Sequence, residues 1–139
     1  MKSQFQRAAS DQEMIEGGIA LGRQLSSGDV IALNGDLGAG KTHFCKGIAL
    51  GFDFEGEVTS PTFSLVHEYR AKTGNIFHFD FYRVESVVEL VDLGWDDYLE
   101  EDGVIVVEWA NKFPEVFPHE TRWFELTIAD NGDHVVVEK

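Results

Sequence analysis

The most regular hydrophobic pattern in the chain is a pair of short, continuous apolar runs at residues 30–33 and 104–107. Runs of this length that are rich in valine and isoleucine are typical of strands buried on both faces of a sheet. Between them, residues 63–70 alternate apolar and polar side chains, and residues 76–81 return as a partner strand after a loop at 71–75. The pattern therefore predicts two buried strands with a β-hairpin between them.

Helical periodicity surrounds these strands. Ser10 and Glu13 have the spacing of a capping box, which predicts a helix that begins there and is ended by residues 26–28. Two adjacent glycines inside this helix, Gly17 and Gly18, indicate close packing against a neighbour or a bend. Further helices are expected over residues 42–51, 87–93 and 95–101, and a last strand pair over residues 123–128 and 134–137.

A glycine-rich loop joins the first apolar run to the helix at 42–51. A strand, this loop and a helix together form the phosphate-binding arrangement called the P-loop. Glycines let backbone N–H groups surround a phosphate, the lysine would reach the terminal phosphates, and the threonine hydroxyl would be a ligand of Mg²⁺. The residues that match the pattern G-x-x-x-x-G-K-[ST] are Gly35, Asp36, Leu37, Gly38, Ala39, Gly40, Lys41 and Thr42.

The order of these elements predicts an α/β fold. We expect a three-layer sandwich of the P-loop NTPase type, whose mixed sheet has a parallel core and antiparallel hairpin strands. With 139 residues, the chain is long enough for one domain with a real core and too short for two. We therefore expect a single P-loop domain over residues 1–139.

Two acids end predicted strands and could complete a nucleotide site. Asp80 lies at the end of the second hairpin strand, and Glu108 follows the apolar run at 104–107. Ligands of open α/β sheets bind beyond the carboxyl ends of the strands, so both acids should face the phosphates. One would hold Mg²⁺, directly or through water, and the other would orient the attacking water. The sequence leaves open which acid contacts the metal.

Residues 58–63 lie between the P-loop helix and the hairpin, where small nucleotide switches keep a loop that senses the γ-phosphate. Thr59, Ser60 and Thr62 place three hydroxyls around Pro61, and one of them could reach the metal or the phosphate. An ordinary turn in which these hydroxyls cap backbone groups fits the same residues equally well.

The base is expected to be adenine. Asn111 and Lys112 begin what could be a guanine-reading N-K-x-D, but Pro114 replaces the aspartate that would accept from guanine. Arg83 likewise stands where a D-x-x-G segment beginning at Asp80 would need glycine. We therefore favour ATP over GTP.

Composition limits the partners and the compartment. The formal net charge is −14, from 11 basic and 25 acidic residues, which disfavours direct binding to nucleic acid. Residues 1–7 lack the apolar core of a signal peptide, and no stretch has the length of a transmembrane helix. Cys45 is the only cysteine, which fits a reducing compartment and a small buried residue better than a nucleophile. We expect a cytoplasmic protein with no membrane contact.

The histidines give little indication of chemistry. The five of them show none of the short spacings that are typical of zinc ligands. His78 shares a strand face with Asp80, which fits packing on the hairpin as well as a role in the site.

Four motifs occur in a fixed order: GDLGAGKT at 35–42, SPTF at 60–63, HFDFYR at 78–83 and VEW at 107–109. In this order and spacing, the chain resembles the TsaE (YjeE) family of bacterial ATPases over about residues 10–118. The resemblance implies a subunit required for threonylcarbamoyladenosine on tRNAs that read ANN codons. It implies ATP and Mg²⁺ as ligands, and hydrolysis that resets a complex with TsaD and TsaB subunits. Taken with the acidic charge balance, it leads us to expect that most tRNA contacts are made by the partners.

The resemblance also implies roles for individual residues. Lys41, Asp80 and Glu108 would be catalytic, and Thr42 and Glu108 would hold the metal. Two switch segments and the residue after the second acid complete the set: Thr59, Ser60 and Thr62, then Tyr82 and Arg83, and Trp109.

Other functions of a P-loop protein stay open. A nonenzymatic switch, controlled by ATP binding alone, fits the same motifs. A small kinase fits less well, because the chain has few basic residues and no insertion long enough for a lid. Hydrolysis by the chain alone should be slow, since Arg83 is the one nearby arginine that could stabilise the transition state.

Overall fold

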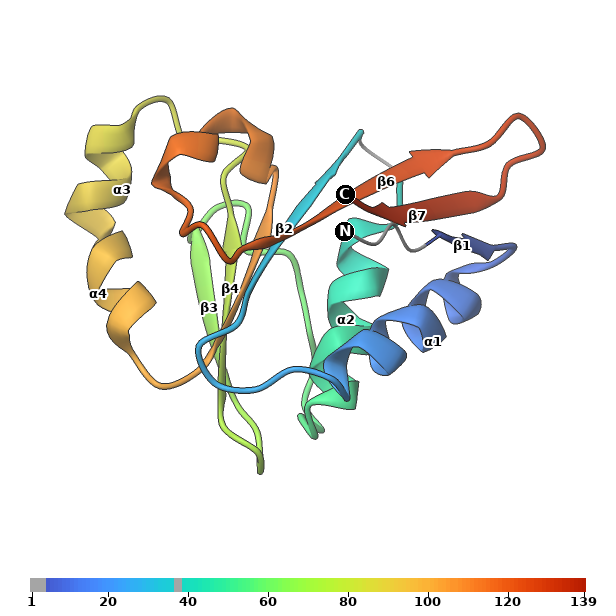
Figure 1. Cartoon of the computed structure of the whole chain (residues 1–139), viewed down its shortest axis with the longest axis horizontal. Helices are drawn as coiled ribbons and strands as arrows, with labels where there is room; N and C mark the ends of the chain where they lie inside the picture. The colour runs from blue at the N-terminus through green and yellow to red at the C-terminus, as the bar shows by residue number, and fades with distance from the viewer. Residues whose placement is uncertain (1–4, 37–38) are drawn as a thin grey trace.

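Seven strands form one mixed sheet in the computed structural model, which describes residues 5–36 and 39–139 (Figure 1). Their order is β1-β7-β6-β2-β5-β4-β3. The four inner strands β6, β2, β5 and β4 run parallel, and β7, β1 and β3 each pair antiparallel. The strands are Phe5–Ala8 (β1), Val30–Gly35 (β2), Val66–Arg70 (β3), Asn75–Asp80 (β4), Val104–Glu108 (β5), Arg122–Ile128 (β6) and His134–Glu138 (β7).

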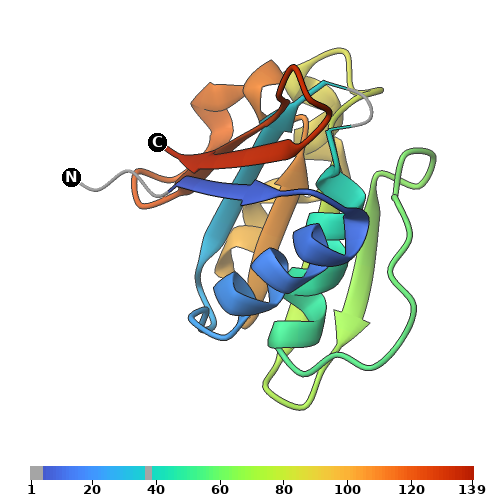
Figure 2. The ribbon, with the colours of Figure 1, turned by 90° about the vertical axis from the view of Figure 1, so that its right-hand side faces the viewer.

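Helices cover both faces of this sheet. The two longer helices, α1 (Asp11–Gly22) and α2 (Lys41–Gly51), pack against one face, as Figure 2 shows. The shorter α3 (Val87–Leu93) and α4 (Trp95–Glu100) lie over the other face (Figure 1). Two short 3-10 turns, η1 (Ala110–Lys112) and η2 (Pro114–Val116), follow β5. The result is the three-layer α/β sandwich that the order of elements predicts.

The two apolar runs are apolar at every position because each contributes to two hydrophobic cores. In β2, Ile31 and Leu33 belong to the core beneath α1 and α2, whereas Val30 and Ala32 belong to the core beneath α3 and α4. The residues of β5 alternate in the same way, and all five are buried. A strand with helices on both sides has no polar face, which is why neither run alternates.

Glycines bring α1 and α2 into direct backbone contact. A Cβ atom on Gly18 would overlap the carbonyl oxygen of Phe44, and one on Gly47 would overlap the carbonyl oxygen of Ile15. The close packing expected at Gly18 is therefore confirmed. Because α2 begins with the P-loop lysine and threonine, this contact ties the end of the P-loop motif to α1.

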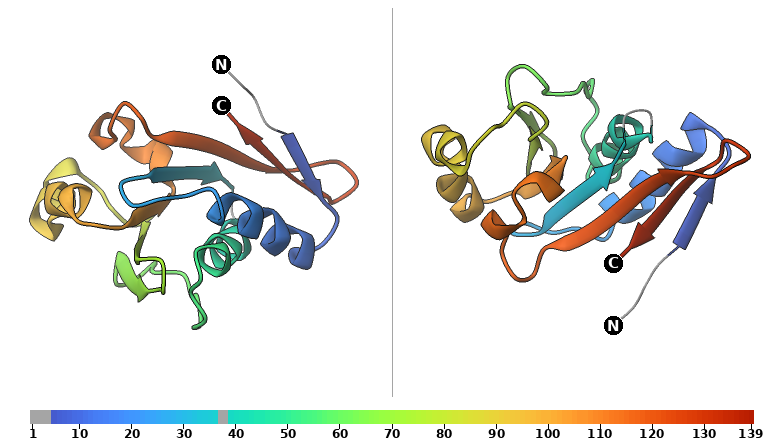
Figure 3. Two further views of the ribbon diagram at one scale, coloured as in Figure 1. Left: turned by 60° about the horizontal axis from the view of Figure 1, so that its bottom comes forward. Right: turned by 90° about the horizontal axis from the view of Figure 1, so that it is seen from above.

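The hairpins at the two ends of the sheet are also as predicted. The β3–β4 pair lies at one end, and the β6–β7 pair with β1 lies at the other (Figure 3). The strand β1 was not predicted, because four residues give too short a pattern to recognise. None of the helices in the described ranges combines the length and apolar character needed to cross a membrane.

Two predicted boundaries are wrong. The first helix ends at Gly22 rather than at residues 26–28, because the N–H groups of Gln24 and Leu25 bond three residues back and tighten the last turn. Strand β3 begins at Val66 rather than at Phe63. Leu65 has a φ of 71°, which breaks the extended alternation and leaves Phe63 84% exposed.

Candidate functional site

The two predicted acids lie side by side at the carboxyl edge of the parallel strands. Asp80 ends β4 and Glu108 ends β5, and the two residues are direct partners in the register of these strands. Leu33 of β2 is the next neighbour of Glu108, so the chain that leaves β2 enters the P-loop at the same edge. Both acids are buried, with 3% of each residue exposed.

The P-loop lies opposite the acids. Gly40 caps α2 in a left-handed conformation with a φ of 94°, and a Cβ atom there would lie 2.9 Å from Cε of Met14. Only glycine fits such a position without strain, which explains the second fixed glycine of the motif. Gly35, the last residue of β2, and Asp36 begin the loop, while Leu37 and Gly38, also predicted to bind the nucleotide, lie outside the described residues.

A cavity of about 380 Å³ opens between these elements, a size typical of small-molecule sites. Asp11 and His43 also line it, and neither was predicted. Asp11 begins α1, which the glycine contacts hold against α2, so this approach cannot be recognised from the sequence. The predicted site residues that line the cavity are Gly40, Lys41, Thr42, Ser60, Thr62, Asp80, Tyr82, Glu108 and Trp109.

Lys41 is folded back onto its own loop. Its ammonium group donates to the carbonyl oxygens of Gly35 and Asp36, and lies 4.2 Å from the ring centre of Trp109. Burial lowers the pKa of Lys41, and the negative charges of Glu108, Asp80 and Asp36 oppose this shift. The lysine is thus a desolvated cation whose present partners are neutral carbonyls, so an anion in the cavity would attract it strongly.

Asp80 organises the loops on one side of the cavity. Its Oδ2 accepts from the hydroxyls of Ser60 at 3.2 Å and Thr62 at 3.0 Å, and its Oδ1 accepts from the N–H of Tyr82 at 2.8 Å. The two predicted switch segments therefore meet at one carboxylate. Thr59, the third hydroxyl residue, contributes its backbone carbonyl instead. That oxygen accepts a hydrogen bond from the Tyr69 hydroxyl at 3.2 Å.

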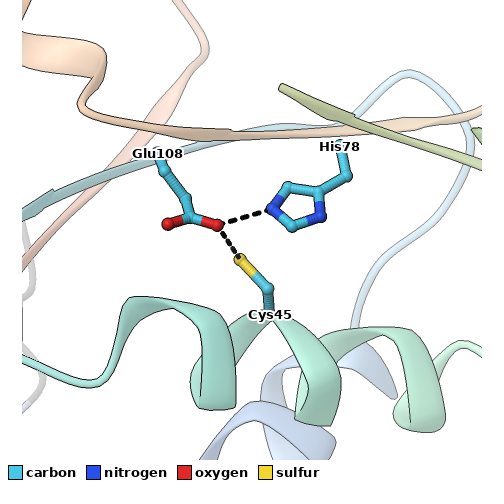
Figure 4. A group of neighbouring side chains, drawn as sticks. All are labelled: Cys45, His78 and Glu108. Carbon is cyan, nitrogen blue, oxygen red and sulfur yellow. Dashed lines mark hydrogen bonds and ion pairs between the residues drawn. The ribbon is translucent and has the colours of Figure 1, made fainter. Parts of the chain in front are cut away.

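Glu108 has different partners, drawn from the core (Figure 4). Its Oε2 lies 2.7 Å from Nε2 of His78 on β4 and 3.9 Å from the sulfur of Cys45 on α2. Burial, followed by the charges of Glu108 and Asp80, raises the pKa of the Cys45 thiol well above its usual range. Cys45 is therefore a buried, protonated residue, as its place in the helix indicated, and not a nucleophile.

His78 is the residue whose place in the site the sequence left open. It is 1% exposed, and both ring nitrogens have partners: Glu108 at Nε2 and the hydroxyl of Tyr69, 3.1 Å from Nδ1. The available signal was its position two residues before Asp80, which places both side chains on the same face of β4. The structure shows both features that the sequence left open, since His78 bonds to Tyr69 of the hairpin partner strand and to Glu108 at the carboxyl edge of the sheet.

Trp109 and Tyr82 close the cavity, while Arg83 points elsewhere. Trp109 has a left-handed backbone with a φ of 59°, and its ring centre lies 4.9 Å from that of Tyr82. The Arg83 guanidinium lies 5.0 Å from the ring centre of the exposed Phe63. In the part of the chain that the structure describes, no arginine lines this cavity.

Comparison with known proteins now identifies the chain. A family model described as "Threonylcarbamoyl adenosine biosynthesis protein TsaE" matches residues 8–136. The chain belongs to the TsaE family. Members of this family take part in tRNA threonylcarbamoyladenosine biosynthesis, so the resemblance carried by the four motifs is confirmed.

Individual TsaE relatives extend the match over most of the chain. The Treponema pallidum protein named "tRNA threonylcarbamoyladenosine biosynthesis protein TsaE" is 35% identical over 127 residues, 91% of this chain and 93% of that protein. The Bacillus subtilis protein of the same name is 44% identical over 106 residues, 76% of this chain and 65% of the relative. The crystal structure of Bacillus subtilis YdiB superposes with a TM-score of 0.79 at 30% identity, covering 99% of this chain and 84% of that one. The TsaE fold therefore extends through the β6–β7 hairpin.

Proposed function

We propose that this TsaE family member binds ATP with Mg²⁺ in the cavity and hydrolyses it, as a subunit that acts with TsaD and TsaB in tRNA modification. The observation that supports this most directly is the adjacency of Asp80 and Glu108, in register and facing the lysine and threonine of the P-loop across one cavity. A phosphate-binding loop alone indicates only that phosphate is bound. Two neighbouring acids supply what hydrolysis also requires.

The residues fit the magnesium nucleotide by their donor sets. The Thr42 hydroxyl and the carboxylates of Glu108 and Asp80 are hard oxygen ligands of the kind that Mg²⁺ prefers, directly or through water. The first N–H groups of α2 and the Lys41 ammonium would hold the phosphates. When bound, Mg²⁺ neutralises charge on the phosphate oxygens.

The chain's own groups then have separate tasks. Lys41 would exchange its carbonyl partners for phosphate oxygens, and Glu108 would help to hold the metal. Asp80 orients a water molecule whose oxygen forms a bond to the γ-phosphorus as the bond to the bridging oxygen breaks, which yields ADP and phosphate. Trp109 and Tyr82 exclude bulk water from that side of the cavity.

The position of Arg83, outside the cavity, predicts that the chain alone hydrolyses ATP slowly. Because its guanidinium packs against Phe63, the proposed complex would have to supply or reorient a cation for full activity. With a net charge of −14, the chain would leave most tRNA contacts to its partners.

The test is ATP hydrolysis with Mg²⁺, TsaD and TsaB, for the wild type, Asp80→Asn and Glu108→Gln. Each acid variant should bind ATP within a few-fold of the wild type and lose roughly 100-fold or more in kcat, the usual loss for a preorganised charge at a reaction centre. Glu120→Gln is the matched control, because it makes the same change at an exposed acid that does not line the cavity, and it should turn over normally. Normal hydrolysis by both acid variants would refute the proposed roles.

A nonenzymatic switch is the second candidate, and the Asp80 contacts favour it. A ligand that drew Asp80 away would release the hydroxyls of Ser60 and Thr62 and thereby change an exposed loop. Binding to TsaD and TsaB should be compared with ATP, ADP and a nonhydrolysable analogue. Equal effects of ATP and the analogue over repeated cycles would favour a switch without hydrolysis.

A further inference from the structure

A chain of hydrogen bonds runs beneath the cavity from the 58–63 loop to Glu108. The Tyr69 hydroxyl lies 3.2 Å from the carbonyl oxygen of Thr59 and 3.1 Å from Nδ1 of His78. On its other side, the His78 ring reaches Oε2 of Glu108 through Nε2 at 2.7 Å. Residues of β3, β4 and β5 thus connect an exposed loop to the buried acid.

Burial makes this connection stiff. Tyr69, His78 and Glu108 are 8%, 1% and 3% exposed. The Tyr69 ring also packs against Phe54, with ring centres 4.8 Å apart, so it cannot rotate away freely. In such surroundings, a lost partner is not replaced by water, and a shift at one end must be accommodated at the other.

The cluster around Glu108 also has the composition of a metal site, and this alternative can be weighed. One ligand atom from each of Cys45, His78 and Glu108 lies within 4.8 Å of the others. Each of those atoms already has a partner inside the chain, and so does the second nitrogen of His78. The hydrogen bonds account for the cluster without an ion.

We propose that His78 is a positioning residue for Glu108, and that with Tyr69 it couples the position of this acid to the loop at 58–63. The coupling rests on the proposed function in one respect, since Glu108 must respond to the metal and nucleotide for the loop to report them. It also works in reverse, because coupling between two sites is reciprocal. A partner that presses on the loop would reposition Glu108.

This path differs from the contacts of Asp80 with the same loop. Asp80 binds the Ser60 and Thr62 side chains directly, near the solvent. The path through Tyr69 and His78 holds the backbone at Thr59 instead, from inside the core. Each acid therefore holds a different part of the loop, and His67, with Nδ1 3.2 Å from the Thr59 carbonyl oxygen, adds a further contact from the surface of β3.

The first test needs no nucleotide, so it is independent of the proposed function. Hydrogen exchange of the amides at 58–65 would be measured in the wild type, Tyr69→Phe, Glu108→Gln and the double variant. Each single variant should raise the exchange rate roughly five-fold, as expected for weakening one net hydrogen bond. The double variant should exchange no faster than the faster single variant, because both changes break one path. Tyr98→Phe is the matched control and should leave the rate unchanged, because the hydroxyl it removes bonds to Glu68 and not to the path.

The second test uses kinetics with TsaD, TsaB, ATP and Mg²⁺. Tyr69→Phe should lower kcat several-fold with KM for ATP unchanged, a split that a general loss of packing would not produce. If the double variant showed the combined effect of the two single variants on the exchange rate, the coupling would be overturned. The same holds if Glu108→Gln left exchange in the loop unchanged. So would a rise in melting temperature with Zn²⁺ that Cys45→Ser abolishes, since the cluster would then be a metal site. Coupled exchange without any ATP hydrolysis would refute only the proposed function.

Discussion

The two sides of the cavity hold their acids by different means. Asp80 is bound by hydroxyl and N–H groups from loops, of which Ser60 and Tyr82 are exposed. Glu108, its direct neighbour in the sheet, is bound by His78 and Cys45, which are buried in the core. Neighbouring carboxylates can therefore serve different purposes: one gathers movable loops, and the other is fixed by the body of the protein.

Removing each acid should reveal this difference in stability, the largest effect that we expect. Glu108→Ala leaves His78 buried without its charged partner and should lower the free energy of unfolding by about 3 kcal/mol. Asp80→Ala should cost only about 1 kcal/mol, because its partners can bond to water instead. Urea unfolding of both variants would measure the contrast, and equal losses would show that the loop contacts are as firm as those in the core.

Replacing Lys41 tests the cation that both acids face. Lys41→Ala should weaken ADP and ATP binding by roughly 100-fold, because the ammonium is the positive group beside the P-loop. Calorimetry would measure the affinity, with Lys46→Ala as the control, since Lys46 is an exposed lysine on the same helix. Undiminished ADP affinity would contradict the P-loop interpretation.

The last prediction concerns pH and belongs to the core side. Burial raises the pKa of Tyr69 to about 12. The hydrogen bond to Thr59 acts in the opposite direction, and the charges of Cys45 and Glu108 raise the pKa further by smaller amounts. Because the folded value exceeds the unfolded value of about 10, the contribution is complete below pH ~10 and is lost as the pH rises towards ~12. Over that window, the wild type should lose about 2 kcal/mol more stability than Tyr69→Phe in urea unfolding. Parallel pH curves would mean that the hydroxyl is not held in the core.

The sequence predicted the outline of the site because its signals are local. The P-loop pattern, the apolar runs and the acids at strand ends each lie within a few residues, and parallel strands place such ends together. The sequence alone therefore predicted that Asp80 and Glu108 lie in the same site.

Other features depend on contacts between distant segments. The place of Asp11 at the cavity follows from glycine packing between two helices, and the bonds of His78 follow from a register that no short pattern fixes. The predicted start of β3 was too early for a local reason. One residue with a left-handed backbone, Leu65, interrupts an otherwise regular alternation of apolar and polar side chains.

The stacking of Lys41 over Trp109 gives the protein an optical reporter of its own. An ammonium group 4.2 Å from the centre of an indole ring perturbs the ring's excited state, and Trp109 is the tryptophan that lines the cavity. Trp95, the first residue of α4, and Trp123 belong to the core beneath α3 and α4, and neither lines the cavity. When a phosphate draws the lysine away, the emission of one indole should change while the other two stay constant, so occupancy of the site can be followed in real time without a label.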